Sequence, residues 1–63
     1  MTRDDDLLSI ATIAQRLDVS RDFVRKAINR GDLDAFRLGT QVRVTEAEFL
    51  RWRADLINQS RAS

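Results

Sequence analysis

The spacing of apolar residues changes along the chain, and the first pattern, from residue 10, is helical. Its apolar members recur every three or four residues and are Ile10, Ile13, Ala14 and Leu17. Residues at this spacing share one face of a helix, and Ser9, directly before them, can cap the first turn with its hydroxyl. The pattern therefore predicts a first helix over 10–17.

A second helix is predicted over 21–30, after a break of three residues, Asp18-Val19-Ser20. Ser20 is a good N-cap, Asp22 lies in the positively polarised first turn, and Gly31 stands where a helix-ending glycine belongs. The apolar stripe of this helix is Val24, Ala27 and Ile28. Two helices joined by so short a turn cannot lie antiparallel side by side, so we expect them to cross steeply.

After Gly31 the apolar spacing shortens to two residues, which is typical of a β-hairpin. The alternating apolar residues are Phe36 and Leu38 before the turn, and Val42 and Val44 after it. Gly39-Thr40 supplies the turn between the two runs. The alternation predicts one apolar face and one basic face, and the basic face would carry Arg37, Gln41 and Arg43.

A third helix of about residues 46–58 is predicted to begin at a capping box, Thr45-Glu46-Ala47-Glu48. Its core face is marked by Phe49, Trp52 and Leu56, and Trp52 is expected to be a core residue. Leu50 and Ile57, seven residues apart, form a second stripe. We expect this second stripe to join the core, and the alternative is a surface for a partner chain.

The order of these elements is helix, three-residue turn, helix, hairpin and helix. It predicts a mainly α domain with a small β-hairpin, which is a winged helix-turn-helix of three helices plus one two-stranded wing. We expect the domain to span 7–58, between a flexible acidic N-terminus at 1–6 and a flexible C-terminal tail at 59–63.

The composition excludes several kinds of chemistry. The 63 residues include no cysteine and no histidine, which removes disulfides, thiol nucleophiles, serine–histidine triads and the usual zinc ligand sets. No pair of carboxylates is framed by a pocket, so we expect neither an enzyme nor a cofactor. No apolar run approaches the length of about 18 residues that a membrane span needs, and no signal-peptide core is present, so a cytoplasmic location is expected.

The distribution of charge is more informative than the net charge of +1. Between Arg16 and Arg53 lie nine basic and six acidic residues, and ten of the eleven cations are arginines, which bind phosphates and guanine edges with two hydrogen bonds. The second helix and the hairpin therefore predict a DNA-binding surface. Its candidate residues are Ser20, Arg21, Asp22, Arg25 and Lys26 on the helix, and Arg37, Thr40, Gln41 and Arg43 on the hairpin.

Several of these residues have a plainer alternative. The polar face of the second helix could be a solvated surface on which Asp22 pairs with Lys26 or Arg25. Asp22 itself is expected to favour the helix dipole, although it could also accept a hydrogen bond from cytosine or orient Arg25. Phe23 is expected to fill the edge of the core beside Val19, with contact to a thymine methyl group or the DNA backbone as the alternative.

Residues 7–28 resemble the start of excisionase-type and MerR-like DNA-binding domains. The resemblance rests on a short apolar start, the A-x-x-L of Ala14-Gln15-Arg16-Leu17 and the turn Val19-Ser20, and Arg25 falls where MerR-like domains carry an arginine. It continues through the matching segments Gly31-Asp32-Leu33, Phe36-Arg37-Leu38-Gly39, Val42-Arg43-Val44 and Thr45 to Trp52, and it covers about 7–56. The chain departs from the pattern at Thr12, Phe23 and Lys26, where glutamate, threonine and tyrosine are common.

The resemblance implies an accessory protein that binds double-stranded DNA and has no enzymatic activity. Phage and prophage excisionases, or recombination directionality factors, bind attachment-site DNA in adjacent copies, bend it and direct an integrase toward excision. Because the sequence ends at residue 63 without a long dimerisation helix or effector domain, an excisionase is the expected member. The alternatives are a small MerR-like or AlpA-like regulator, and a protein-interaction module that uses Leu50, Ile57 and the acidic N-terminus without a DNA role.

Overall fold

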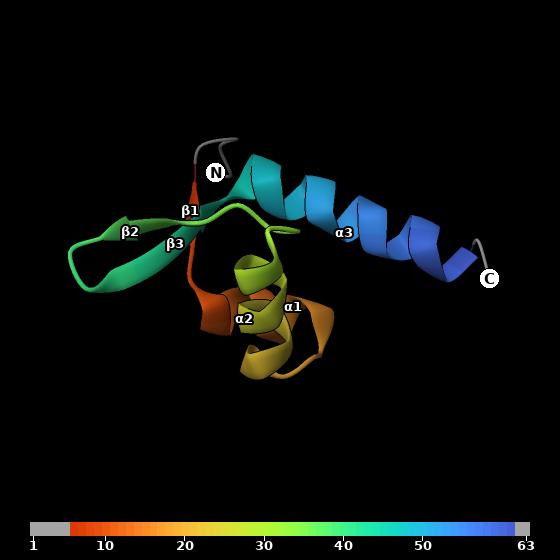
Figure 1. Cartoon of the computed structure of the whole chain (residues 1–63), viewed down its shortest axis with the longest axis horizontal. Helices are drawn as coiled ribbons and strands as arrows, with labels where there is room; N and C mark the ends of the chain where they lie inside the picture. Colours follow the sequence, from red (N-terminus) through yellow and green to blue (C-terminus); the bar gives the residue numbers. More distant parts are fainter. Residues whose placement is uncertain (1–5, 62–63) are drawn as a thin grey trace.

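The computed structural model describes residues 6–61, which form three helices and three short strands (Figure 1). The elements in chain order are β1 (Leu7–Leu8), α1 (Ile10–Leu17), α2 (Arg21–Arg30), β2 (Phe36–Leu38), β3 (Gln41–Thr45) and α3 (Glu46–Arg61). The predicted winged helix-turn-helix is confirmed, and α1 and α2 have the predicted bounds. In the part of the chain that is described, no helix is both long and apolar enough to cross a membrane.

The turn between α1 and α2 is built from local hydrogen bonds. Asp18 adopts the left-handed conformation at φ 56°, and the next N–H, of Val19, donates to the Ala14 carbonyl at 2.9 Å. The Ser20 hydroxyl then accepts a hydrogen bond from the Phe23 N–H at 3.1 Å, which caps α2 as predicted. Gly31 ends α2 at φ 85°, a conformation that glycine adopts without steric cost.

The strand β1 was not predicted, because two residues are too few to show a period. It pairs antiparallel with β3, with Leu7 opposite Thr45 and Leu8 opposite Val44, so that β3 is the central strand of a sheet ordered β1-β3-β2. Asp6 lies in the segment that we assigned to a flexible N-terminus, yet its carbonyl accepts a hydrogen bond from the Glu46 N–H at 2.8 Å. The rest of that segment, residues 1–5, lies outside the described residues.

The helix α3 is longer than predicted. It continues to Arg61, so residues 59–61, which we assigned to a flexible tail, form its last turn, and 62–63 lie outside the described residues. No glycine or proline stands between Glu46 and Arg61 to stop the helix. In Figure 1 the C-terminal half of α3 projects beyond the other elements.

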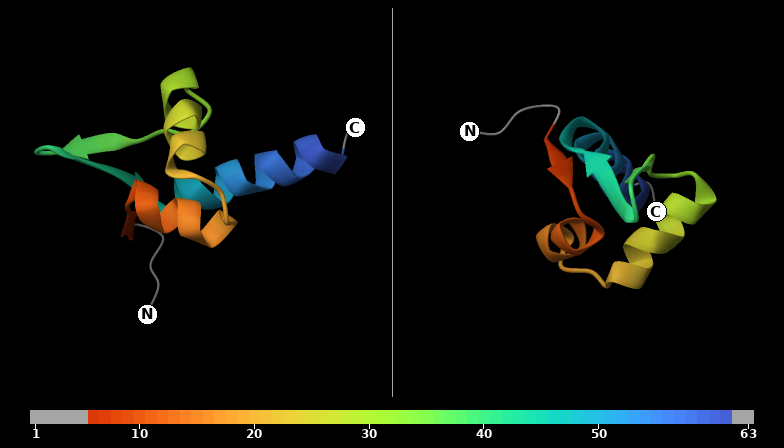
Figure 2. Two further views of the ribbon diagram at one scale, coloured as in Figure 1. Left: turned by 90° about the horizontal axis from the view of Figure 1, so that it is seen from below. Right: turned by 90° about the vertical axis from the view of Figure 1, so that its left-hand side faces the viewer.

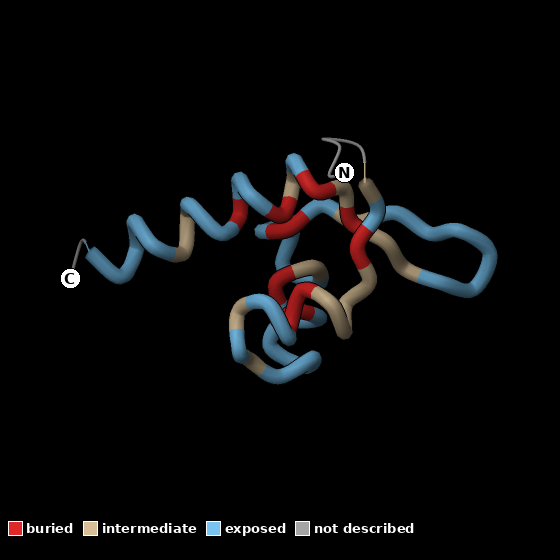
Figure 3. The backbone as a smooth tube through the Cα atoms, turned by 180° about the vertical axis from the view of Figure 1, so that it is seen from behind, coloured by how far each residue is buried: buried red, intermediate tan, exposed pale blue. Residues whose placement is uncertain are grey.

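The core joins all three helices to the sheet. Its buried apolar residues are Leu8, Ile13, Ala14, Val24, Ala27, Leu33, Val44, Phe49 and Trp52 (Figure 3). Trp52 is only 2% exposed, which confirms its predicted place in the core. Leu50 and Ile57 remain 47% and 38% exposed, so the prediction that they join the core is wrong. Only one side of α3 is covered, and these two residues lie outside that side.

The predicted division of the hairpin into an apolar and a basic face is also wrong. Phe36 pairs with Arg43, Arg37 with Val42 and Leu38 with Gln41, and residues directly opposite each other share a face. The two strands are joined by a two-residue loop in which Gly39 has a φ of 62°, as in a type II′ turn. A loop of this length places each even-numbered residue of one strand opposite an odd-numbered residue of the other. The apolar residues all have even numbers, so those of β2 and those of β3 must lie on opposite faces.

This register leaves two apolar side chains of the wing exposed. Phe36 and Leu38 are 40% and 49% exposed and share their face with Gln41 and Arg43, whereas Val44 on the other face is buried. Arg37 lies opposite Val42 and therefore shares the face that carries the core residue Val44.

An ion pair joins α1 to the start of α3. Glu46 is buried, and its Oε1 lies 3.2 Å from Nη1 of Arg16. The Arg16 guanidinium also lies over the Phe49 ring, 5.7 Å from its centroid, where a cation is attracted to the ring face. Arg16 therefore has a structural role.

Only half of the predicted capping box forms at the start of α3. The Thr45 hydroxyl accepts a hydrogen bond from the Glu48 N–H at 3.2 Å. The Glu48 carboxylate accepts from the Asp34 N–H at 3.0 Å and from Arg51, and it thereby ties α3 to the loop that precedes β2. The hydrogen bond from Arg51, together with that from Asp34, lowers the pKa of Glu48 below its ordinary value of 4.5.

We predict that Glu48→Gln lowers stability at neutral pH and weakens its dependence on acid pH. A carboxylate whose pKa is lowered by folding stabilises the protein above its unfolded pKa, and this contribution is lost as the pH falls through the lowered value. The expected loss at neutral pH is about 1 kcal/mol, as for a typical hydrogen bond. Urea denaturation between pH 7 and pH 3 measures both effects. Asp55→Asn is the control, because Asp55 pairs with the same Arg51 but is more exposed than Glu48. Equal pH dependence in the wild type and Glu48→Gln would contradict the prediction.

Candidate nucleic-acid interface

The helix α2 carries its polar residues on a face set by its buried side. Val24 and Ala27 are fully buried and fix the rotation of the helix about its axis. Arg21 is its first residue and Arg25 follows one turn later, so the two exposed arginines lie one above the other. Asn29 continues this row in the next turn.

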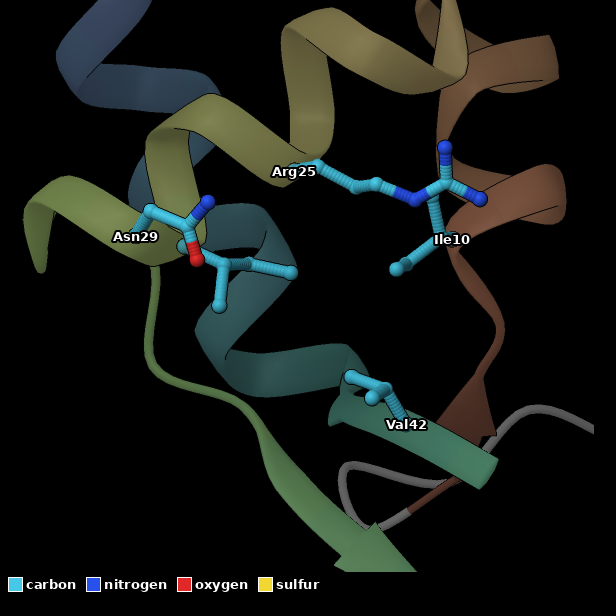
Figure 4. Close-up of a pocket in the computed structure, with 5 residues that line it drawn as sticks. Ile10, Arg25, Asn29 and Val42 are labelled. Atoms are coloured by element: carbon cyan, nitrogen blue, oxygen red, sulfur yellow. The ribbon is translucent and has the colours of Figure 1, made fainter. Parts of the chain in front are cut away.

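This face of α2 opens on a hollow that we call the α2–β3 groove. It is lined by Ser9, Ile10 and Ala11 at the start of α1, by Arg21 and Arg25 of α2, and by Gln41, Val42 and Arg43 of β3. The hollow has a volume of about 420 Å³. An adjoining, more apolar hollow is formed where Ile28 and Asn29 meet Ile10, Arg25 and Val42 (Figure 4).

The groove brings together four of the residues that the sequence singled out. Arg21 and Arg25 reach it from α2, and Gln41 and Arg43 reach it from the wing. In Figure 2 the hairpin extends to one side of α2, whereas α3 extends to the other. The helix and the wing therefore present their arginines to a common space, and α3 leaves that space open.

Arg43 is held in place at the groove by neutral partners. Its Nη1 donates to the Val42 carbonyl at 2.8 Å and its Nη2 donates to Oε1 of Gln41 at 2.5 Å. Neither partner is a carboxylate, so these bonds bring no negative charge next to the guanidinium. A guanidinium has five N–H donors, and these two bonds leave the others available to a ligand.

The remaining candidates lie outside the groove. Asp22 and Lys26 form an exposed ion pair of 3.2 Å one helical turn apart, which is the plainer alternative for these two residues. Ser20 uses its hydroxyl to cap α2, and Thr40 is exposed in the turn of the wing. Arg37 is exposed on the face of the hairpin that carries Val42. Phe23 lies at the edge of the core, with its ring centroid 6.1 Å from that of Trp52, but it remains 41% exposed, so it fills that edge only in part.

In the described chain, most arginines of α2 and the wing differ from most other cations in having no carboxylate partner. Arg16, Lys26, Arg30 and Arg51 each form an ion pair with a carboxylate. Among residues 6–61, Arg21, Arg25, Arg37 and Arg43 have no carboxylate within ion-pair distance, and the same is true of Arg53 and Arg61 on α3. Cations that no acid neutralises therefore gather on α2 and the wing, where they attract a polyanion.

Sequence reasoning missed the part of α1 that contributes to the groove. Ser9 and Ile10 were assigned only to the cap and the core of α1, and Ala11 was given no role, because without β1 nothing placed the start of α1 beside β3. Asn29 was also omitted from the candidates. The signal that could have found it is its position four residues after Arg25, on the same helix face.

Comparison with known proteins agrees with this architecture. Residues 7–56, from β1 into α3, match the family model described as a helix-turn-helix domain. No match emerged among the curated proteins or the solved structures with which the chain was compared. The matched range includes both helices of the helix-turn-helix, the wing and the aromatic residues of α3. With this match over most of its length, the chain belongs to the helix-turn-helix domain family and is a DNA-binding protein with the winged form of that fold.

Proposed function

We propose that the protein is an excisionase-type accessory factor, which binds attachment-site DNA, bends it and directs an integrase toward excision. The observation that carries the DNA-binding part is the α2–β3 groove, where Arg21 and Arg25 of the helix and Arg43 of the wing meet with no carboxylate among the lining residues. A helix fits the major groove of B-DNA, and a narrow hairpin fits the adjacent minor groove. Both elements can therefore dock on one duplex at the same time.

Each candidate residue has a place in this arrangement. Arg25 donates two hydrogen bonds to a guanine edge in the major groove, and Arg21 binds a phosphate at the start of α2. Ser20, Asp22 and Lys26 flank these contacts at the N-terminal half of the helix. The residues that would bring the wing onto the adjacent minor groove are Arg37, Thr40, Gln41 and Arg43.

The size of the domain favours binding in several copies. The molecule measures 39 × 26 × 20 Å, and single modules of this size bury roughly 600–1,000 Å² of protein surface on DNA, which predicts weak binding at one site. Several copies side by side on repeated sites would bind more tightly. They would also share the cost of bending a site of 20–30 base pairs, which is on the order of 1–6 kcal/mol.

The test is to identify the DNA that the protein selects. We expect the protein, mixed with sheared DNA of its source genome, to retain fragments from attachment sites near an integrase gene, with several adjacent footprints in each. Retention of promoter fragments alone, with single footprints, would favour a transcriptional regulator and contradict the excisionase role. Addition of the neighbouring integrase to the retained fragments then tests whether excision depends on the protein.

Replacing Arg43 by alanine is predicted to reduce the salt dependence of duplex binding by about one phosphate contact. Each neutralised phosphate steepens the plot of log affinity against log salt by about 0.9, because bound counterions are released. Fluorescence anisotropy with a random-sequence duplex at several salt concentrations measures the slope. Arg53→Ala is the control, since Arg53 is also unpaired but lies on α3, and its slope should equal that of the wild type. An unchanged slope in Arg43→Ala would show that the wing is not docked.

A further inference from the structure

We infer that Arg21 and Arg43 hold one and the same backbone phosphate of the bound duplex, in the α2–β3 groove and against the start of α1. This inference rests on the proposed function, because it assumes that α2 and the wing dock on the same DNA. It adds a contact by α1, which the sequence did not predict. It also makes two arginines from different elements a single anion site.

The first support is the path that the DNA backbone must take. The major and minor grooves of a duplex are separated by one sugar–phosphate strand. If α2 lies in the major groove and the wing lies in the adjacent minor groove, that strand passes between α2 and β3. The α2–β3 groove is the hollow between these two elements, so a phosphate of that strand comes to lie over it.

The second support is the charge within the groove. Three of its lining residues are arginines, Arg21, Arg25 and Arg43, and no acidic residue lines it. Like charges gathered in one hollow repel one another, and an anion relieves the repulsion. Because Arg43 is held by the carbonyl of Val42 and by the side chain of Gln41, its guanidinium is oriented before the anion arrives.

The third support is the set of unused donors at the start of α1. The Ser9 hydroxyl accepts from the Thr12 N–H at 3.1 Å, and the Ser9 carbonyl accepts from the Ile13 N–H at 3.0 Å. In the described part of the chain, the N–H groups of Ile10 and Ala11 are the first-turn donors left without such a partner, and both residues line the groove. They add donors, and the positive end of the helix dipole, to the two arginines.

A shared phosphate has a definite consequence for the protein. Phosphate contacts set the position of a protein on the duplex but carry no base information. An anion fixed between α2 and β3 would set the distance of the wing from the recognition helix, and would therefore couple major-groove to minor-groove docking. Arg25 lines both this groove and the adjoining apolar hollow, and in the complex that we infer its guanidinium extends to the bases instead of the phosphate.

The first test uses the free protein and inorganic phosphate, at constant ionic strength, with amide and arginine side-chain resonances followed by NMR. We expect saturable shifts in the millimolar range at Ile10, Ala11, Arg21 and Arg43. Arg21→Gln and Arg43→Gln should each reduce these shifts at least several-fold, and Arg53→Gln should leave them unchanged. Absent shifts, or shifts spread over all exposed arginines and unaffected by the variants, would overturn the inference. Circular dichroism confirms that each variant is folded.

The second test is a double-variant cycle on duplex DNA. If Arg21 and Arg43 hold one phosphate together and neither retains it alone, Arg21→Ala, Arg43→Ala and the double variant each lower the salt slope by about one contact. Separate phosphates predict a fall of about two in the double variant. A fall of two would overturn the inference and leave the proposed function intact. If the wild type binds no duplex at any salt concentration, the proposed function fails, and the phosphate titration alone decides whether the groove is an anion site.

Discussion

Replacing Trp52 by alanine is expected to unfold much of the domain. Trp52 is 2% exposed and lies in the one core that joins the three helices to the sheet, and its ring also supports Phe23 of α2. Truncation of a buried tryptophan removes its hydrophobic contribution and leaves a cavity, which together cost about 3–5 kcal/mol. A chain of 63 residues buries only about 60% of the surface that its unfolded form exposes, a lower share than in larger domains, so its total stability is of similar size.

Thermal and urea denaturation followed by circular dichroism measure this effect without relying on tryptophan fluorescence. Leu50→Ala is the matched control on the same helix. Leu50 is apolar but 47% exposed, so its truncation should change stability by less than about 0.5 kcal/mol. A Trp52→Ala variant that melts with the wild type would refute the assignment of Trp52 to the core. A large loss in Leu50→Ala would instead show that the exposed face of α3 is covered in solution.

Replacing Arg25 by alanine is expected to weaken binding to the specific DNA site by roughly 1–3 kcal/mol, the cost of losing a bidentate contact to a base. Arg25 is exposed and unpaired in the middle of α2, and its neighbours Val24 and Ala27 hold the helix in the core. The variant should therefore fold normally, and its loss of affinity should reflect the missing contact. The change should also relax selectivity at one base pair.

The variant Arg25→Lys tests whether binding depends on the positive charge alone or on the two parallel N–H donors of the guanidinium. Lysine keeps the positive charge but lacks the planar pair of donors, so this variant should bind random duplex nearly as well as the wild type and lose selectivity. Arg53→Ala, which removes an unpaired arginine from α3, should change neither property. Titration of the selected site and of random duplex by anisotropy gives both affinities. Unchanged affinity of Arg25→Ala for the selected site would remove Arg25 from the interface.

Local signals predicted the helices well because each signal acts within one turn of the chain. Ser9 and Ser20 bond to N–H groups three residues away, and Gly31 needs only its own backbone freedom to end α2. The wing was predicted in its position but not in its faces. Its register follows from the two-residue loop at Gly39-Thr40, which is local, but the apolar alternation pointed to a different pairing.

The side chains at the start of α3 show where local reasoning ends. The capping box predicted that Glu48 would bond back to its own helix, yet its carboxylate binds Asp34 and Arg51 instead. Leu50 and Ile57 have the spacing of core residues, but nothing in the described chain packs over them. An apolar or charged side chain can contact its own helix or a segment that is distant in the sequence, and the outcome depends on which partner lies nearer in space. The spacing of residues along the chain does not reveal that distance in space.

The sequence by itself determined the three helices, the turn between the first two, the wing, and the excess of arginine on α2 and the wing, because caps, periods and charge act over a few residues. The tertiary structure alone decided that β1 pairs with β3 and that the start of α1 therefore lies beside the wing. It also decided that Arg21 and Arg43, far apart in the chain, line one groove. These are contacts between distant segments, and they form only when the common core of Ile13, Val24, Val44 and Trp52 brings α1, α2, β3 and α3 together.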